Sequence, residues 1–273
     1  MSQDHSATSV LASLETMLEH LTHEFEGEIL WWRGHGDATW ELIPGAFREQ
    51  VSGVTGQALV HHFKTRAAGR LGHRRLPSTE LEWLLLAQHY GLPTQLLDWT
   101  ENVLVALYFA VMDKSQDGLD ACVWALSPSL MNMHLADPYK PGKAQRGLVD
   151  FEDRPIRGMA MRATGFGDDA IRRMVFTDHT SMPLLPGAVA LLAPEADERI
   201  VAQSGRFTLH STPKDLTTLQ GAQGFLRKLA IPSNQKVRIR GLLSAMGMRR
   251  WNLFPDLSSL AAGLKAGGYS SII

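Results

Sequence analysis

This chain of 273 residues contains almost no cysteine and no long apolar run. The one cysteine, Cys122, excludes an internal disulfide framework and a zinc site built from several cysteines. It lies in the apolar run 121–126, which favours a buried, unreactive strand thiol. The longest unbroken apolar run, 103–112, has about half the length of a membrane span. Residues 1–13 lack the basic and then apolar pattern of a secretory signal, so we expect a cytoplasmic protein.

An excess of charge of one sign is also missing, because 27 Lys and Arg residues face 28 Asp and Glu residues. This balance excludes a strongly basic nucleic-acid coat protein and a polybasic membrane binder. Two long stretches nevertheless carry basic residues and no acid, and their basic parts span 61–75 and 227–250. They are typical of an anionic partner such as DNA, RNA or a nucleotide, and a merely solvated basic face explains them equally well.

The composition, with 44% hydrophobic and 20% charged residues, is that of an ordinary globular protein. We expect an N-terminal helical segment over 1–27 and a single domain over 28–273. Thr79 and Glu82 form a capping-box pattern, and Thr100 or Asp98 is placed to cap the following helix. Residues 127–185 show little periodicity and form a candidate lid over a site.

Clustered strands and separate helices together predict an α+β fold. Apolar periodicity predicts helices over 8–24, 56–71, 79–90, 101–112 and 241–265, and strands over 28–33, 120–126, 187–193, 199–203, 206–210 and 236–240.

Several enzyme classes are excluded by motifs that the chain does not contain. It has no Gly-x-Gly-x-x-Gly fingerprint, no Walker A loop and no Gly-x-Ser-x-Gly elbow. The 11 histidines include no His-Glu-x-x-His pair. The two close pairs, His61-His62 and His20 with His23, lack nearby carboxylates arranged as metal ligands. We therefore expect no metal site.

Three segments carry more polar and aromatic chemistry than a core requires. In Trp31-Trp32-Arg33-Gly34-His35, strand alternation places Trp31 and Arg33 on one face and Trp32 on the other. An arginine in that position can bind an anionic oxygen through its planar fork, or it can form a structural ion pair.

The second segment runs from Gln88 through His89, Tyr90, Thr94, Asp98 and Trp99 to Thr100, between two apolar helices. The amides that follow Thr100 begin a helix and could bind an anion, although helix capping explains part of the pattern. The third segment is Gln203-Ser-Gly-Arg-Phe207, where a polar residue at a strand end faces either a ligand or a hairpin tip.

Together these segments resemble the FRG domain family. The resemblance rests on Trp32-Arg33-Gly34, on Trp40 with Leu42 and Pro44, on the block 88–100, on Ala106-Leu-Tyr-Phe-Ala110, and on the later segments 199–207 and 253–257. It extends from about residue 28 to about residue 258. Trp32 stands where the family has Phe, and His35 stands where glutamine is usual. The family resembles components of bacterial toxin or anti-phage systems.

The order of these residues is also similar to that in ADP-ribosyltransferases of the Arg-Ser-Glu type, which use NAD as substrate. The similarity implies a split β-sheet core with an N-terminal helix and flanking helices. It implies catalytic roles for Arg33, Asp98, Thr100 and Gln203. It implies NAD contacts from Arg33, Gly34, His35, Gln88, His89, Tyr90, Thr94, Trp99 and Thr100. Trp31, Tyr90 or Trp99 would stack on a ring of NAD.

Gln203 stands where those enzymes carry a glutamate, and a neutral amide neither stabilises a cation by charge nor acts as a base. Asp98, Glu101 or Glu198 would then supply the carboxylate. Three hypotheses follow: an NAD-dependent ADP-ribosyltransferase that modifies a nucleic acid, a non-catalytic module that binds a nucleotide or a phage component, and a nuclease.

Overall fold

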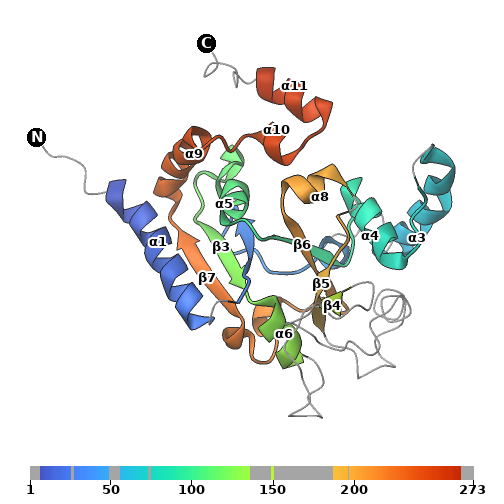
Figure 1. The fold of residues 1–273 in the computed structure, drawn as a ribbon, viewed down its shortest axis with the longest axis horizontal. Helices are drawn as coiled ribbons and strands as arrows, with labels where there is room; N and C mark the ends of the chain where they lie inside the picture. Colours follow the sequence, from blue (N-terminus) through green and yellow to red (C-terminus); the bar gives the residue numbers. More distant parts are fainter. Residues whose placement is uncertain are drawn as a thin grey trace, which may run out of the picture.

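Seven strands form one sheet at the centre of the molecule (Figure 1), in the order β4-β5-β6-β2-β1-β3-β7. The computed structural model describes residues 7–25, 28–48, 56–72, 75–135, 149–150, 187–195 and 197–265. The strands are β1 (Trp31–His35), β2 (Leu96–Thr100), β3 (Ala121–Leu126), β4 (Val149–Asp150), β5 (Ala188–Leu192), β6 (Gly205–His210) and β7 (Leu226–Ile231). The helices are α1 (Ala7–Glu24), α2 (Gly45–Arg48), α3 (Gly56–Ala67), α4 (Glu80–His89), α5 (Val103–Val111), α6 (Pro128–Leu135), α8 (Glu198–Ala202), α9 (Lys236–Ala245), α10 (Arg250–Leu253) and α11 (Leu257–Lys265). This mixture confirms the predicted α+β class.

The centre of the sheet is where its pairing is weakest. The pairs β1–β3, β2–β6, β3–β7 and β5–β6 are antiparallel, and each is matched over at least four residues. Between β1 and β2, by contrast, Trp32 opposite Thr100 is the only matched pair. The sheet therefore consists of two halves, β4-β5-β6-β2 and β1-β3-β7, that are joined at one point.

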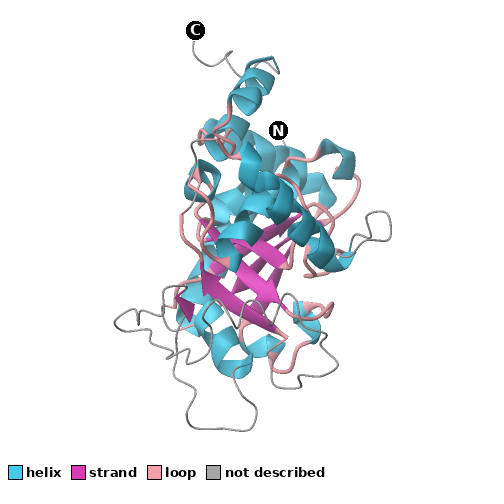
Figure 2. Ribbon diagram, turned by 90° about the vertical axis from the view of Figure 1, so that its right-hand side faces the viewer, coloured by secondary structure: helices cyan, strands magenta, loops and turns pink. Residues whose placement is uncertain are grey.

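Helices pack on both sides of the strands, as Figure 2 shows. Strand alternation sends Trp32 into a core with α1, α5 and α9, whereas Trp31 packs on the other face with residues of α6. A third core joins α3 and α4 to β2, β5 and β6. The predicted opposite orientation of the two tryptophans is thus confirmed.

Helix α5 approaches β1 so closely that only glycine fits between them. A Cβ atom built on Gly34 would lie 1.9 Å from the Ala106 carbonyl oxygen and 2.7 Å from the Ala110 nitrogen. Both atoms belong to the helix backbone, so a side chain could not be accommodated by a rotamer change. Gly34 therefore fixes the distance between α5 and the strand that carries Arg33.

The structure confirms some predicted elements and corrects others. The Thr79–Glu82 capping box begins α4, and Cys122 is fully buried on β3. Residues 199–203, predicted as a strand, lie mostly in the short helix α8, because Asp197 caps the amides of Arg199 and Ile200.

The predicted strand 236–240 is also wrong, since these residues begin α9. This helix buries Lys236, Ile239 and Leu243 along one side. The predicted helix over 241–265 consists of the end of α9 followed by α10 and α11. Strands β2, β4 and β7 were not predicted. Helix α5 is capped by Asn102, whose side chain accepts from the Leu104 amide, and not by Asp98 or Thr100. Most of the candidate lid 127–185 lies outside the described residues.

Candidate functional site

A cavity of about 300 Å³ lies at the break between β1 and β2. Its wall combines one residue of β1, several of β2, the end of α4 and the turn after α8. Seven residues that the sequence analysis selected line it together: Arg33, Gln88, His89, Thr94, Asp98, Trp99 and Gln203. Residues far apart along the chain are thus brought into one site of the size used for small ligands.

Arg33 bridges the two halves of the sheet. Its Nη1 donates to the Asp98 carbonyl oxygen of β2 at 2.6 Å, and its Nε donates to His35 Nε2 at 2.9 Å. Burial lowers the pKa of the guanidinium from its ordinary value, while the nearby Asp98 charge opposes that change. Because a guanidinium has five N–H donors, Nη2 and one donor of Nη1 are left for an anionic ligand.

His35 acts on Arg33 and does not line the cavity. Its side chain is buried, and burial lowers the pKa of the imidazole to about 3, so the ring is neutral at pH 7. A neutral ring whose Nε2 accepts from Arg33 must carry its proton on Nδ1. His35 therefore supplies a hydrogen-bond acceptor that holds the guanidinium in place.

A short chain of hydrogen bonds orients Asp98. The Leu96 amide donates to the Thr94 hydroxyl, which donates to Gln88 Oε1, and Gln88 Nε2 donates to Asp98 Oδ1 at 2.6 Å. This order fixes which end of the Gln88 amide faces the carboxylate. Gln88 and Thr94 thus serve to position Asp98, whose side chain is exposed at the middle of β2.

Thr100 and Gln203 join the end of β2 to the turn before β6. The Thr100 hydroxyl donates to the Gln203 carbonyl oxygen at 2.6 Å and accepts from the Asn102 amide at 3.0 Å. Gln203 Nε2 donates to the Leu253 carbonyl oxygen at 2.9 Å. The amides of residues 101, 102 and 104 all have protein acceptors, so these three donors are satisfied within the protein.

A larger groove of about 920 Å³ adjoins the cavity. Four residues line both spaces: Leu85, His89, Asp197 and Arg199. His89 Nδ1 lies 3.3 Å from Asp197 Oδ2, and the Arg199 guanidinium lies 4.9 Å from the centre of the Phe254 ring. These residues form the boundary between the two spaces.

Four predicted site residues do not line the cavity: Gly34, His35, Tyr90 and Thr100. Gly34 faces α5, and Tyr90 is exposed with its ring edge-on to His89. Trp31 is fully buried, which leaves no face free to stack on a ligand. Trp99 lines the cavity, and its indole donates to the Thr208 hydroxyl at 3.0 Å.

Sequence reasoning missed Asp197, and Arg48 and Arg199 as further lining residues. Asp197 is the N-cap of α8. Aspartate is a preferred N-cap residue, so its place before the run 198–202 was a signal that could have been recognised. Of the two other candidate carboxylates, Glu101 pairs with Arg206 at 2.8 Å, and Glu198 lines the larger groove.

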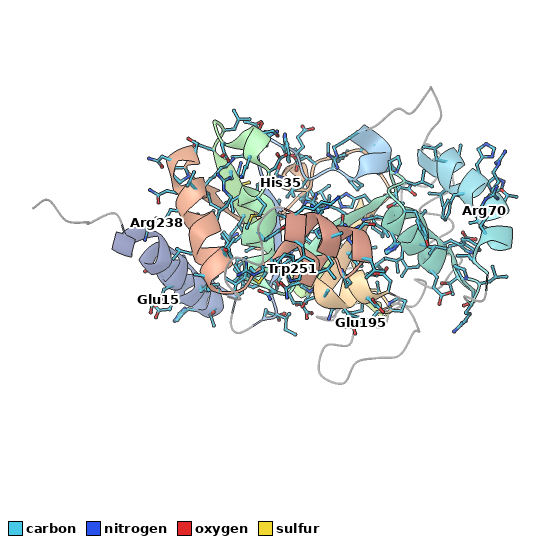
Figure 3. The ribbon with its side chains drawn as sticks, turned by 90° about the horizontal axis from the view of Figure 1, so that it is seen from above. Glu15, His35, Arg70, Glu195, Arg238 and Trp251 are labelled. Atoms are coloured by element: carbon cyan, nitrogen blue, oxygen red, sulfur yellow. The ribbon has the colours of Figure 1, made fainter. Side chains whose placement is uncertain are left out.

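The two basic stretches are spread over several elements of the fold. Arg70 and Arg238, one from each stretch, stand far apart in Figure 3. Several cations of the second stretch are engaged within the protein: Arg227 with Glu24, Arg240 with Asp117, and the buried Lys236 with two carbonyl oxygens. Arg250 of the second stretch, by contrast, packs on Phe254, which lines the same groove as Arg75 of the first stretch.

Comparison with known proteins identifies part of the chain. Residues 28–119, about one third of the chain, match the family model of the FRG domain. The matched segment contains Arg33 and the whole block from Gln88 to Thr100. No curated protein and no solved structure matches the chain.

No helix within the described segments combines the length and the apolar character of a membrane span. No three His, Cys, Asp or Glu side chains within them gather as ligands of a metal ion would.

Proposed function

We propose that this FRG protein is an NAD-dependent ADP-ribosyltransferase-like effector of the toxin or anti-phage type. The observation that carries the proposal is the break between β1 and β2, where Arg33 spans two half-sheets beside a cavity. A sheet split at this point is what an ADP-ribosyltransferase-like core requires. The cavity suits one end of NAD, and the adjoining groove gives the remaining room.

The reaction breaks the bond between the ribose C1′ and nicotinamide, whose nitrogen keeps the electron pair, and forms a bond from C1′ to an acceptor nucleophile. Positive charge develops on the ribose as the first bond breaks. Preorganised charges and dipoles at that position stabilise such a transition state. In this site, Arg33 would hold phosphate oxygens with its free N–H donors, and Asp98 would face the developing cation.

Gln203 stands at the position of the catalytic glutamate, and Asp98 is the carboxylate best suited to take over the role of that glutamate. It lines the cavity, and the Gln88 amide fixes its orientation through one oxygen. Glu101 is neutralised by Arg206, and Glu198 lines the groove and not the cavity. Gln203 would then orient ribose hydroxyls through its side-chain oxygen, since its nitrogen donates to Leu253.

Nicotinamide release from NAD tests this function. Wild type, Arg33→Ala, Asp98→Asn and the exposed-surface control Lys114→Ala would be assayed alone and with single-stranded DNA, duplex DNA and RNA. We expect release by wild type and Lys114→Ala, a loss of about a hundredfold or more in both site variants, and a rise with the acceptor class. Equal release by all four proteins would refute the assignment.

A second function, binding of a nucleotide without catalysis, is favoured by Gln203. Its amide is neutral and is tied to the Leu253 carbonyl oxygen. NAD binding that depends on Arg33, without nicotinamide release under any of these conditions, would support this alternative. A nuclease needs a cluster of acidic ligands for a divalent metal ion, and within the described segments no such cluster supports it. EDTA-sensitive cleavage of DNA or RNA would reveal one.

A further inference from the structure

His89 stands at the boundary between the cavity and the groove, and it lines both. It is the last residue of α4, directly before the turn that leads to β2. Its side chain is about one third exposed, at 31%. A reagent bound in either space could therefore reach its ring.

Asp197 holds the opposite side of the same boundary. Its Oδ1 accepts from the amides of Arg199 at 2.8 Å and Ile200 at 2.9 Å, which fixes the carboxylate at the start of α8. Its other oxygen, Oδ2, lies 3.3 Å from His89 Nδ1. A carboxylate on that side draws the ring proton to Nδ1 and leaves Nε2 as an acceptor. The two atoms are not aligned as a hydrogen bond, and among the described residues Nδ1 is a buried atom without a hydrogen-bond partner. Catalytic hydrogen bonds are commonly poorly aligned before substrate binds and tighten in the complex.

The other residues that line both spaces are less suited to take a proton from a bound acceptor. Leu85 is apolar, and the Arg199 guanidinium, which stacks on Phe254, offers only N–H donors. The Asp197 carboxylate accepts from two backbone amides through Oδ1, and its Oδ2 faces the histidine. Among the residues at the boundary, His89 is thus the group with the chemistry of a general base.

We propose that His89 Nε2 takes the proton of the acceptor nucleophile, with Asp197 as the residue that positions the ring. This inference rests on the proposed function. The acceptor lies in the groove, and the electron pair of its O–H or N–H atom forms the new bond to C1′. Its proton passes to Nε2, and the pair of the broken bond leaves with nicotinamide. The resulting imidazolium returns its proton to water. This arrangement supplies the base that Gln203 cannot be.

Chemical rescue tests the role of His89. The variant His89→Ala opens space at the boundary, and we expect transfer to the acceptor to fall about a hundredfold or more. Added imidazole should restore a substantial part of that loss in His89→Ala. It should not accelerate wild type or the control His20→Ala, which removes an exposed histidine of α1. Full activity of His89→Ala, or a loss that imidazole leaves unchanged, would overturn the proposal.

The tautomer of His89 tests the role of Asp197 without any turnover. Serine caps helices about as well as aspartate, so Asp197→Ser keeps the start of α8 and removes the oxygen that faces His89. The matched control is Asp215→Ser, because Asp215 caps a short helix elsewhere. Nitrogen NMR of the labelled ring should show the proton on Nδ1 in wild type and in the control, and on Nε2 in Asp197→Ser. A proton on Nε2 in wild type would overturn the inference even if no NAD turnover were found. The remaining outcome separates the two proposals. If wild type releases nicotinamide and shows the expected tautomer but His89→Ala has no effect, only the role of His89 is overturned.

Discussion

Replacing Gly34 with alanine should destabilise the protein strongly, although the change adds a single methyl group. The new Cβ would lie 1.9 Å from the Ala106 carbonyl oxygen, more than an ångström inside ordinary contact. Overpacking a well-filled core costs about 1–3 kcal/mol and sometimes more. The upper end applies here because the obstructing atoms belong to the backbone of α5 and not to a flexible side chain.

The backbone of Gly34 is not in the left-handed region, so alanine itself introduces no conformational strain there. The lower entropy of the unfolded alanine chain returns about 0.4–1 kcal/mol. We therefore expect the free energy of unfolding to fall by about 2–3 kcal/mol, and the melting temperature by about 5–10 °C.

Urea unfolding followed by circular dichroism measures this effect. The matched control is Gly69→Ala, because a Cβ atom at Gly69 meets no atom within 4 Å. The control should unfold within about 0.5 kcal/mol of wild type or be slightly more stable. An unfolding midpoint of Gly34→Ala equal to that of the control would refute the argument that α5 packs directly on β1.

Three further predictions follow from buried polar groups. Lys236 is fully buried and donates to the carbonyl oxygens of Gly36 at 2.7 Å and Gln116 at 2.5 Å. Lys236→Met should therefore lower the free energy of unfolding by about 2–4 kcal/mol, because both oxygens lose their donor. An unchanged urea midpoint would contradict this. Burial lowers the pKa of His35 and of His210 to about 3, whereas the unfolded chain takes up these protons near 6.5. Stability should therefore fall between about pH 6.5 and pH 3, by about 1.4 kcal/mol per pH unit for each histidine, and the slope should be smaller in His35→Gln. Burial also raises the pKa of the Cys122 thiol to about 11, so a thiol reagent should modify Cys122 only after unfolding in urea; rapid reaction of the folded protein would show that the thiol is exposed.

Much of the fold could be predicted from local patterns, and the errors have physical causes. The capping box and nearly continuous apolar surface of α4 indicated a buried helix, and α4 is one. Residues 236–240 alternate in polarity like a strand. Yet Lys236, Ile239 and Leu243 share one side of a helix, and burial along that side decided the outcome. Strand β7 was missed because Arg227 and Lys228 interrupt its apolar residues, and both cations make contacts that only the folded chain provides.

The candidate site was predicted better in its residues than in their roles. Arg33, Gln203 and most of the block from Gln88 to Asp98 lie around one cavity, as the order of the motifs suggested. His35 and Gly34, in contrast, do not line the cavity. Strand alternation turns His35 toward the Arg33 guanidinium and Gly34 toward α5. The approach of Asp197 to His89 joins residues from α4 and the start of α8, and no local pattern specifies it.

Calorimetric titration with NAD tests most directly whether the cavity at the break between β1 and β2 is a nucleotide site. Wild type and the control Lys114→Ala should bind NAD with the same affinity. Arg33→Ala should bind at least about tenfold more weakly, since it loses the charged hydrogen bonds to phosphate, each worth about 1.5–3 kcal/mol. Binding of NAD by Arg33→Ala as tight as that by wild type would contradict the role of Arg33 and, with it, the proposed function.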